Sequence, residues 1–586
     1  MVKQRLEIIF FNKYVYGLLF VAFLPALLLY WSYGIDKLVE WPVPHWPIIS
    51  VLFLISGGIL SLKGIYDLYR YGKGLPMNAY PPRIFVTKGA YAWFSHPIYV
   101  GAFFLSFGAS LWFQSGSGLY LITPVLALMM VSLVFGYERF IIKKIVGNSV
   151  IIYNPIFGLP STSENRASLG KKMAMLVIIF IPWLASGYLI DWAHSSGTIG
   201  AYAKLFSILN WHDWVSVIWI VPYIYIAIRI LMARTGRSLA HTAITGILAV
   251  AVGIYLYLIL PPFGVEFTGN PWILILVSLV STCLAIIHHK VWSILRKYSE
   301  YVANSRHDWL FVNGRFRIIN HSLYSGLAGA VGTGIVSYIT DNNYAALVLL
   351  LCALLGAALF AQLRWANTSL RRPFGFWGGI LGGIAGFTAA HFWFGVPISQ
   401  IALAGVLCAT FVQAIGRLRC LAQGCCHGIL TRQDLGIRVW QKQSRVVTIS
   451  GLEGRYILIT QLYSILFNIL LGFLLWSIWL SDSVNSWFII GLYLIMTGIE
   501  RFTEDAYRGE VQTKMAKGLK ENQWIAIIAI VIGIIITTIP GPASLIADGQ
   551  FDIPYWSTVV LGGLITSFAM SMDFPKSNIR FSRLSG

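Results

Sequence analysis

The sequence is poor in charge, and poorest in acidic charge. Only 11% of its 586 residues are charged, and 43 Lys and Arg outnumber 23 Asp and Glu. Together with a hydrophobic content of 57%, this composition excludes an ordinary soluble domain. The basic residues lie in loops between apolar runs, which is the bias of loops on the cytoplasmic side of a membrane. We therefore expect a membrane protein with no nucleic-acid partner.

Cysteine is also scarce, and the few cysteines do not indicate an extracellular disulfide-bonded domain. None of the six cysteines has the spacing of an extracellular disulfide framework. The six are Cys283, Cys352, Cys408, Cys420, Cys425 and Cys426, and most of them lie in or beside apolar runs. No small-residue cleavage site follows the first apolar run, so we expect no cleavable signal peptide there.

Long apolar runs make up most of the chain, and the mean hydropathy is +0.71. Roughly sixteen runs are long enough to span a bilayer, from residues 15–33 to residues 558–569. They lack the alternation of membrane-spanning strands, so we expect helices. The expected fold is an all-α polytopic membrane protein with roughly sixteen transmembrane helices and one small polar head loop at about 416–455.

Polar segments divide the chain into three regions, 1–160, 161–300 and 301–586. A polar and basic linker at 161–172 separates the first two. Within the head loop, residues 435–439 (LGIRV) predict a short strand, which makes the loop a small folded head.

The stretch GRLRCLAQGCCHG, residues 416–428, directly follows the apolar run 398–415. Two arginines beside lipid cost several kcal/mol unless they face protein, water or an anion. The natural anion at that depth is a lipid phosphate, which a guanidinium grips with two parallel hydrogen bonds. Arg417 and Arg419 therefore suggest a lipid phosphate as the anion that they face.

Other motifs accompany this stretch in order: RIINHSLYSG (317–326), FWGGILG (376–382), TQLY (460–463) and GIERF (498–502) followed by Asp505 and Arg508. As an ordered set, they resemble the pattern of prolipoprotein diacylglyceryl transferases. The resemblance implies a multi-pass enzyme of the bacterial cytoplasmic membrane. It would move a diacylglyceryl group from phosphatidylglycerol to a lipoprotein-precursor cysteine without a cofactor.

The resemblance also implies roles for residues. Arg417 and Arg501 would hold the phosphate with Arg508 in support, Asp505 would hold Arg501 or Arg508, and Tyr324 and Tyr463 would orient the head group. Trp377, Cys420, Gln423 and Cys425 stand where the family has histidine, asparagines and glutamate, so His427, and next His321, replace the usual general base. The remaining substrate-binding candidates are Gln423, Gln461, Gly378, Gly379 and Cys425.

The run Cys425-Cys426-His427 has several interpretations. We rank a tight structural turn first, catalytic support second, and a metal or redox site last, because adjacent cysteines rarely chelate one ion well. The pair His288-His289 is read as interfacial, since neighbouring side chains on a helix point about 100° apart. We therefore expect no metal site.

The segment 86–113 and Glu138 resemble the isoprenylcysteine carboxyl methyltransferase and phospholipid methyltransferase group. The resemblance implies S-adenosylmethionine as cofactor, bound by Tyr91, His96, Tyr99 and Glu138. Ser95 and Arg139 stand where the group has arginine and a second glutamate. A working methyltransferase and a retained fold without cofactor both remain open.

The middle region, 161–300, only weakly resembles phosphatidic-acid-type membrane phosphatases, through Pro261-Pro262 and the later spacing of Arg315 and His321. Ser325 stands in place of that family's aspartate, so we assign it no activity. A third possibility for the whole chain is a non-catalytic protein that binds or flips lipids. Positive loops place the Arg417 loop in the cytoplasm, whereas the transferase resemblance places it outside, and the conflict stays open.

Overall fold

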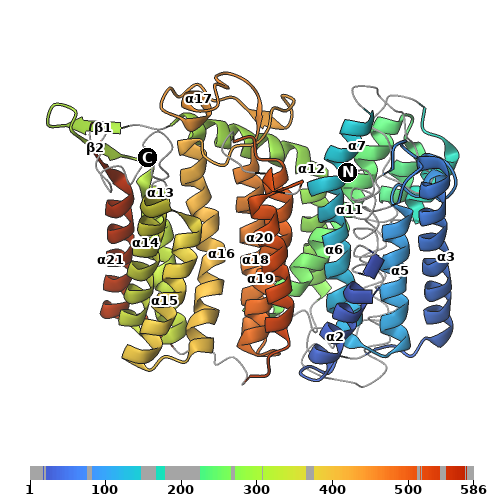
Figure 1. Ribbon diagram of the computed structural model, residues 1–586, viewed down its shortest axis with the longest axis horizontal. Helices are drawn as coiled ribbons and strands as arrows, with labels where there is room; N and C mark the ends of the chain where they lie inside the picture. The colour runs from blue at the N-terminus through green and yellow to red at the C-terminus, as the bar shows by residue number, and fades with distance from the viewer. Residues whose placement is uncertain are drawn as a thin grey trace, which may run out of the picture. The chain divides into compact units, whose positions relative to one another are not determined.

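The computed structural model describes residues 17–18, 22–41, 43–75, 82–146, 166–177, 225–264, 271–305, 308–364, 375–510, 515–516, 518–541, 549–574 and 576. The chain forms two compact units, residues 1–289 and 290–586, which we describe separately (Figure 1). The long helix α12 (Pro271–Asn304) runs from the first unit into the second, so the predicted border at residue 300 falls inside a helix.

Glycines bring the helices of the first unit close together. A Cβ atom on Gly57 of α3 (Pro47–Gly72) would lie 2.7 Å from the carbonyl oxygen of Gly101 on α5 (Pro97–Trp112). Such small-residue contacts let membrane helices approach closely. The other described elements are α2 (Leu24–Asp36), α4 (Ala90–Trp93), η2 (Gly118–Ile122), α6 (Thr123–Leu133), η3 (Val134–Glu138), α7 (Arg139–Val146), α11 (Gly236–Ile259) and η4 (Pro261–Phe263).

The second unit is a set of helices that run alternately up and down. These are α13 (Ser322–Thr340), α14 (Asn343–Arg364), α15 (Phe376–Phe394), α16 (Ile398–Gln423), α18 (Thr460–Leu480), α19 (Ser486–Ala506), α20 (Glu521–Thr537) and α21 (Ile553–Ser571). The C-termini of α16 and α19 and the N-termini of α18 and α20 share one end (Figure 1).

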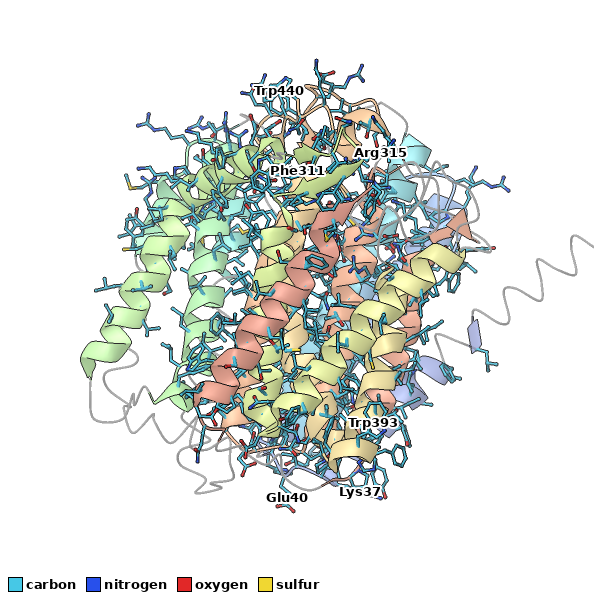
Figure 2. All side chains as sticks on the ribbon, turned by 90° about the vertical axis from the view of Figure 1, so that its left-hand side faces the viewer. Lys37, Glu40, Phe311, Arg315, Trp393 and Trp440 are labelled. Carbon is cyan, nitrogen blue, oxygen red and sulfur yellow. The ribbon has the colours of Figure 1, made fainter. Side chains whose placement is uncertain are left out.

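Small sheets lie at that same end, so the fold is not purely helical. β1 (Asp308–Phe311), β2 (Phe316–Ile319) and β7 (Met572–Asp573) form an antiparallel sheet in that order. β3 (Gly436–Ile437) pairs with β4 (Ile457–Leu458), and β5 (Met515–Ala516) pairs with β6 (Leu519–Lys520). In Figure 2, Phe311, Arg315 and Trp440 mark this end and Trp393 the opposite one.

The head of the second unit, residues 424–459, contains β3, β4 and the short helix α17 (Arg445–Thr448). β3 confirms the short strand predicted at 435–439. Two predicted boundaries were wrong. Residues 416–423 continue α16 rather than opening the loop, and Ile457–Leu458 is a strand rather than the start of a spanning helix.

Eight helices in the described part of the chain are long and apolar enough to cross a membrane. A polytopic helical membrane protein is thereby supported, while the number sixteen stays a prediction. The predicted runs 173–189 and 214–231 fall largely outside the described residues. The basic residues Lys63 and Arg70 lie on α3.

Candidate functional site

The site begins where α16 ends. Gly424 terminates the helix with φ +77°, and Cys426 two residues later also has a positive φ of 57°. A Cβ atom on Gly424 would lie 2.1 Å from Ser444 Oγ of the head. Only glycine fits both the left-handed backbone and this close approach. The turn thus fastens the head directly onto the last turns of α16, which carry Arg417.

Gly424→Ala should therefore destabilise the second unit, by about 1–3 kcal/mol from backbone strain alone. We expect a lower thermal midpoint for the detergent-solubilised protein and faster proteolysis within the head. Gly416→Ala is the matched control, because a Cβ atom there meets nothing within 4 Å. Equal midpoints for the two variants would contradict the proposed role of the turn.

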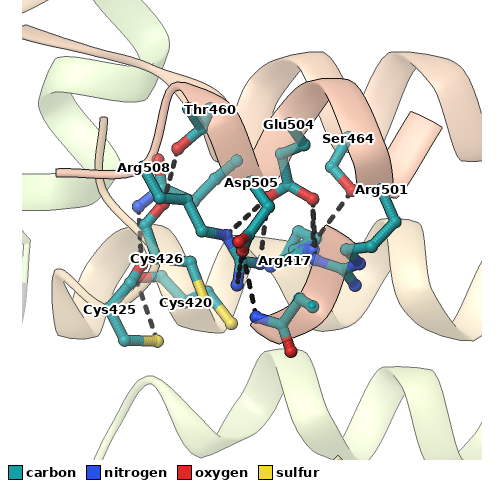
Figure 3. Close-up of polar contacts among 12 residues, drawn as sticks. Arg417, Cys420, Cys425, Cys426, Thr460, Ser464, Arg501, Glu504, Asp505 and Arg508 are labelled. Carbon is teal, nitrogen blue, oxygen red and sulfur yellow. Dashed lines mark hydrogen bonds and ion pairs between the residues drawn. The ribbon is translucent and has the colours of Figure 1, made fainter. Parts of the chain in front are cut away.

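Three arginines converge on the carboxylate of Glu504 (Figure 3). Arg417 Nη2 lies 3.0 Å and Arg501 Nη1 2.7 Å from Glu504 Oε2, and Arg508 Nη2 lies 3.1 Å from Glu504 Oε1. Arg417 Nε also donates to Ser464 Oγ of α18 at 3.2 Å. The cluster thus joins α16, α18 and α19, and Glu504 is buried. A buried charge requires such partners.

The end of α19 is held by a second set of contacts. Arg508 Nη1 lies 3.3 Å from Asp505 Oδ1, which also accepts a hydrogen bond from Asn522 Nδ2 of α20. Lys520 Nζ donates to the main-chain oxygens of Asp505 and Arg508 at 2.6 and 2.9 Å. The predicted pairing of Asp505 with an arginine is found for Arg508. Arg501 pairs instead with Glu504.

Three cysteines lie beside the arginines. The sulfur atoms of Cys420, Cys425 and Cys426 lie within 4.8 Å of one another. Gln461 Nε2 donates to the carbonyl oxygen of Cys425 at 2.7 Å, which fixes the turn to α18. Hydrogen bonds from the Cys420 and Cys425 thiols, aided by the positive charge of Arg508 and Arg417, hold the pKa of Cys426 well below its usual value.

The two histidines expected to act as a base occupy other settings. His427 is buried in the head, where Nε2 lies 2.8 Å from Ser450 Oγ and Nδ1 lies 3.0 Å from the carbonyl oxygen of Gly428. These contacts tie its ring to the head. His321 is buried at the residue before α13. Their predicted roles stay predictions.

The other predicted residues are spread over the same end of the unit. Tyr463 stacks on Trp292 with ring centroids 5.4 Å apart, Tyr324 packs against the buried core of the head, and Gln423 is buried at the end of α16. Gly378 is a packing residue, because a Cβ atom there would lie 2.3 Å from the carbonyl oxygen of Gly356 on α14. Gly379 has ordinary space around it.

The predicted site set omitted Glu504, Glu500 and Ser464. Arg501 and Glu504 are spaced i and i+3 on α19, and Arg508 follows two residues after the helix ends, so the spacing predicts that the three side chains lie on one side of the chain. That spacing was visible in the sequence. Glu500 hydrogen-bonds to Ser464, and its buried Oε1 has no hydrogen-bond partner in the described part of the chain.

A second cluster lies in the first unit. The carboxylate of Glu138, at the end of the π-helical turn η3, accepts a hydrogen bond from Tyr99 Oη and lies 3.4 Å from His96 Nδ1. The rings of His96 and Tyr99 stack with centroids 5.8 Å apart. Three of the four predicted cofactor residues are thus together. Tyr91 lies on the preceding short helix α4.

The buried carboxylate of Asp67 holds the segment before this cluster in place. Asp67 Oδ2 accepts a hydrogen bond from the main-chain nitrogen of Ala90 at 2.7 Å, and Lys63 Nζ lies 2.7 Å from Oδ1. Gly89 has φ +65°, and a Cβ atom there would lie 2.1 Å from Asp67 Oδ2. The glycine of the methyltransferase-like motif is therefore required by its contact with α3.

Residues 314–539 match the family model of prolipoprotein diacylglyceryl transferase, and residues 46–149 match that of phospholipid methyltransferase. Both resemblances are confirmed. The chain is 30% identical over 128 residues to the phosphatidylglycerol–prolipoprotein diacylglyceryl transferase of Clostridium tetani, covering 22% of this chain and 48% of that protein. It is 27% identical over 167 residues to such a transferase, numbered 2, of Clostridium perfringens, covering 28% of this chain and 60% of that protein.

The chain thus spans about half to three fifths of the length of these relatives. The transferase match contains every member of the arginine cluster, and the methyltransferase match contains the Glu138 cluster. The arginine cluster and the Glu138 cluster therefore each lie inside a segment that matches a family model.

Proposed function

We propose that the second unit transfers a diacylglyceryl group from phosphatidylglycerol to the cysteine thiol of a lipoprotein precursor, at the cytoplasmic membrane of a bacterium. The observation that supports this most is the convergence of Arg417, Arg501 and Arg508 at the end of two apolar helices. Positive charge fixed at that depth suits a lipid phosphate.

Arg417 and Arg501 are the phosphate-binding groups. Arg417 uses Nε and Nη2 for Ser464 and Glu504, so its other N–H groups can donate to phosphate oxygens. The side chain of Arg501 is 20% exposed, which gives a lipid head group access to it. Arg508 forms ion pairs with Glu504 and Asp505 and adds positive charge to the cluster.

In the reaction, the thiol sulfur attacks the carbon of the diacylglyceryl group that is bonded to the phosphate oxygen. A carbon–sulfur bond forms, the carbon–oxygen bond breaks, and glycerol phosphate leaves with the electron pair. The arginines stabilise the charge on the leaving phosphate. The thiol proton goes to the carboxylate of Glu500, whose Oε1 is not hydrogen-bonded within the described residues. The positive surroundings favour the thiolate as nucleophile.

The test uses the full chain in nanodiscs that contain phosphatidylglycerol labelled in its diacylglycerol part. A peptide with a lipoprotein-type cysteine serves as acceptor, and mass spectrometry detects the thioether product. We expect product with the cysteine peptide and none when serine replaces that cysteine. Folded protein that makes no thioether under these conditions would refute diacylglyceryl transfer to this acceptor.

A second candidate function belongs to the first unit, and the Glu138 cluster favours it. A half-buried carboxylate beside two stacked aromatic rings suits a sulfonium cation, so the residues present fit the cation of S-adenosylmethionine. That cofactor supplies a methyl group, and a lipid or prenyl-like molecule is the proposed acceptor. Glu138, His96 and Tyr99 would hold and orient the cofactor.

Glu138→Gln should weaken binding of labelled S-adenosylmethionine by about 10- to 100-fold, the usual worth of a hydrogen bond or contact with a charged group. Glu40→Gln is the control, because Glu40 is an exposed glutamate of the same unit. Equilibrium dialysis with the full chain gives both constants. If the wild-type chain does not bind the cofactor, the first unit has kept the fold of the methyltransferase group without its cofactor site.

A further inference from the structure

Three histidines meet in the first unit, in a region that neither family match covers. His241 lies near the start of α11, and His288 and His289 lie in the middle of α12. One ligand nitrogen from each lies within 4.8 Å of the others. The sequence had suggested that His288 and His289 point too far apart to share an ion. The third histidine, from the neighbouring helix, changes that conclusion.

The ring positions suit a common ion. With a metal–nitrogen distance of about 2.0–2.1 Å and tetrahedral angles, ring centroids of two ligating imidazoles lie about 5 Å apart. The centroids of His241 and His288 are 5.3 Å apart, those of His288 and His289 5.7 Å, and those of His241 and His289 5.9 Å. Small side-chain rotations close the remaining difference.

His288 is already oriented as a metal ligand. Its Nδ1 lies 2.6 Å from the carbonyl oxygen of Ala285, one turn earlier on α12. The nitrogen that donates there carries the proton, which leaves Nε2 as the ligand atom. Metal-ligating histidines characteristically donate their other nitrogen to such a carbonyl or to a carboxylate. The hydrogen bond thus fixes both the tautomer and the ring direction.

Residues of both helices beside the histidines belong to one buried core. Leu239 and Ala243 of α11 and Ala285 of α12 are almost fully buried in one shared core. These residues flank His241 and His288 along their helices, so the backbone positions of the two ligands are set by packing. His241 and His289 are exposed, so protein side chains do not cover the cluster completely. Buried neighbours that fix the backbone beside exposed ligands suit a metal site.

We propose that His241, His288 and His289 bind one divalent transition-metal ion of the class that prefers imidazole, such as Zn²⁺, Co²⁺ or Ni²⁺. Three neutral nitrogens leave the ion its positive charge and a coordination position for water. The described residues hold one other group of this kind, Cys420, Cys425 and Cys426. That group would offer sulfur rather than nitrogen, which makes the two sites distinguishable by spectroscopy.

The experiment uses tag-free full chain in nanodiscs, stripped with chelator and titrated with Co²⁺. We expect one equivalent per chain, with visible bands of cobalt bound to nitrogen and oxygen and no thiolate charge-transfer band. His241→Gln and His288→Gln should each weaken binding by more than about 100-fold, because loss of a ligand costs more than loss of its supporting contact. Thermal midpoints check that both variants fold.

His391→Gln is the matched control. His391 lies on α15 of the second unit, with Nδ1 3.0 Å from the carbonyl oxygen of Val396, and should leave cobalt binding unchanged. Three outcomes would overturn the proposal: a wild-type chain that binds no cobalt, undiminished binding in His241→Gln and His288→Gln, or a thiolate band that places the ion on the cysteines. Transfer activity is not the readout, so the result is independent of the proposed reactions.

Discussion

Arg417→Ala is expected to lower diacylglyceryl transfer by about 10²–10³-fold, the usual effect of removing one donor that stabilises developing charge. The protein should remain folded. Glu504, the partner that Arg417 leaves behind, keeps Arg501 and Arg508 as neighbours, so its buried charge is not stranded. The thioether assay measures the first effect, and the thermal midpoint in detergent measures the second.

Two further variants sharpen this test. Arg417→Lys restores one positive charge but cannot supply both the Nε contact to Ser464 and the Nη2 contact to Glu504, so recovery should be partial. Arg432→Ala is the matched control, since Arg432 is an exposed head arginine paired with nearby Asp434, which is also exposed. Wild-type turnover in Arg417→Ala would remove this residue from the phosphate site.

Local patterns explain which parts of the fold could be predicted. Long apolar runs predicted helices, and LGIRV at 435–439 suggested a short strand, because each pattern acts over a few neighbouring residues. The boundary predicted at residue 416 was wrong because contacts that are distant in the sequence decide where the helix ends. Arg417 looked like a loop residue by its charge, yet contacts with α18 and α19 let the helix continue through it to Gln423.

In the candidate site, too, some residues could be predicted from local patterns and others depended on contacts between helices. Arg417, Arg501 and Arg508 could be found from a short motif and from the cost of charge beside lipid. Glu504 was considered only as a structural partner of the arginines, beside Asp505, because both acids have helical spacing to Arg501 and Arg508 and spacing does not distinguish them. That Glu504 also binds Arg417, 87 residues earlier, depends on the packing of α16 against α19, which no local pattern encodes.

The meeting of His241 with His288 and His289 has the same origin. The sequence shows the adjacent pair, and helix geometry correctly says that these two side chains diverge. It does not show that Ala243 of α11 and Ala285 of α12 belong to one buried core, beside which a third imidazole lies near the pair. Contacts between helices therefore turned an unremarkable pair into a candidate metal site.

Glu504→Ala should have the largest effect on stability, because it leaves three guanidiniums without their shared carboxylate. Breaking a buried ion pair by removing one partner costs about 3–5 kcal/mol. For a unit of this size, that corresponds to a midpoint lower by on the order of 10 °C. Glu453→Ala, at an exposed glutamate of the head, is the control and should leave the midpoint unchanged.

A double-mutant cycle separates the ion cluster from a general effect of altering α19. If Arg417 and Glu504 interact directly, Arg417→Ala should destabilise the wild type but cost less, or even stabilise, in the Glu504→Ala background, where Arg417 is a buried cation without its acid. The expected coupling is about 0.5–3 kcal/mol for side chains in contact. Additive midpoints would contradict the direct interaction. Coupling would show that Glu504 is what allows the chain to keep its phosphate-binding arginines at the ends of two membrane helices.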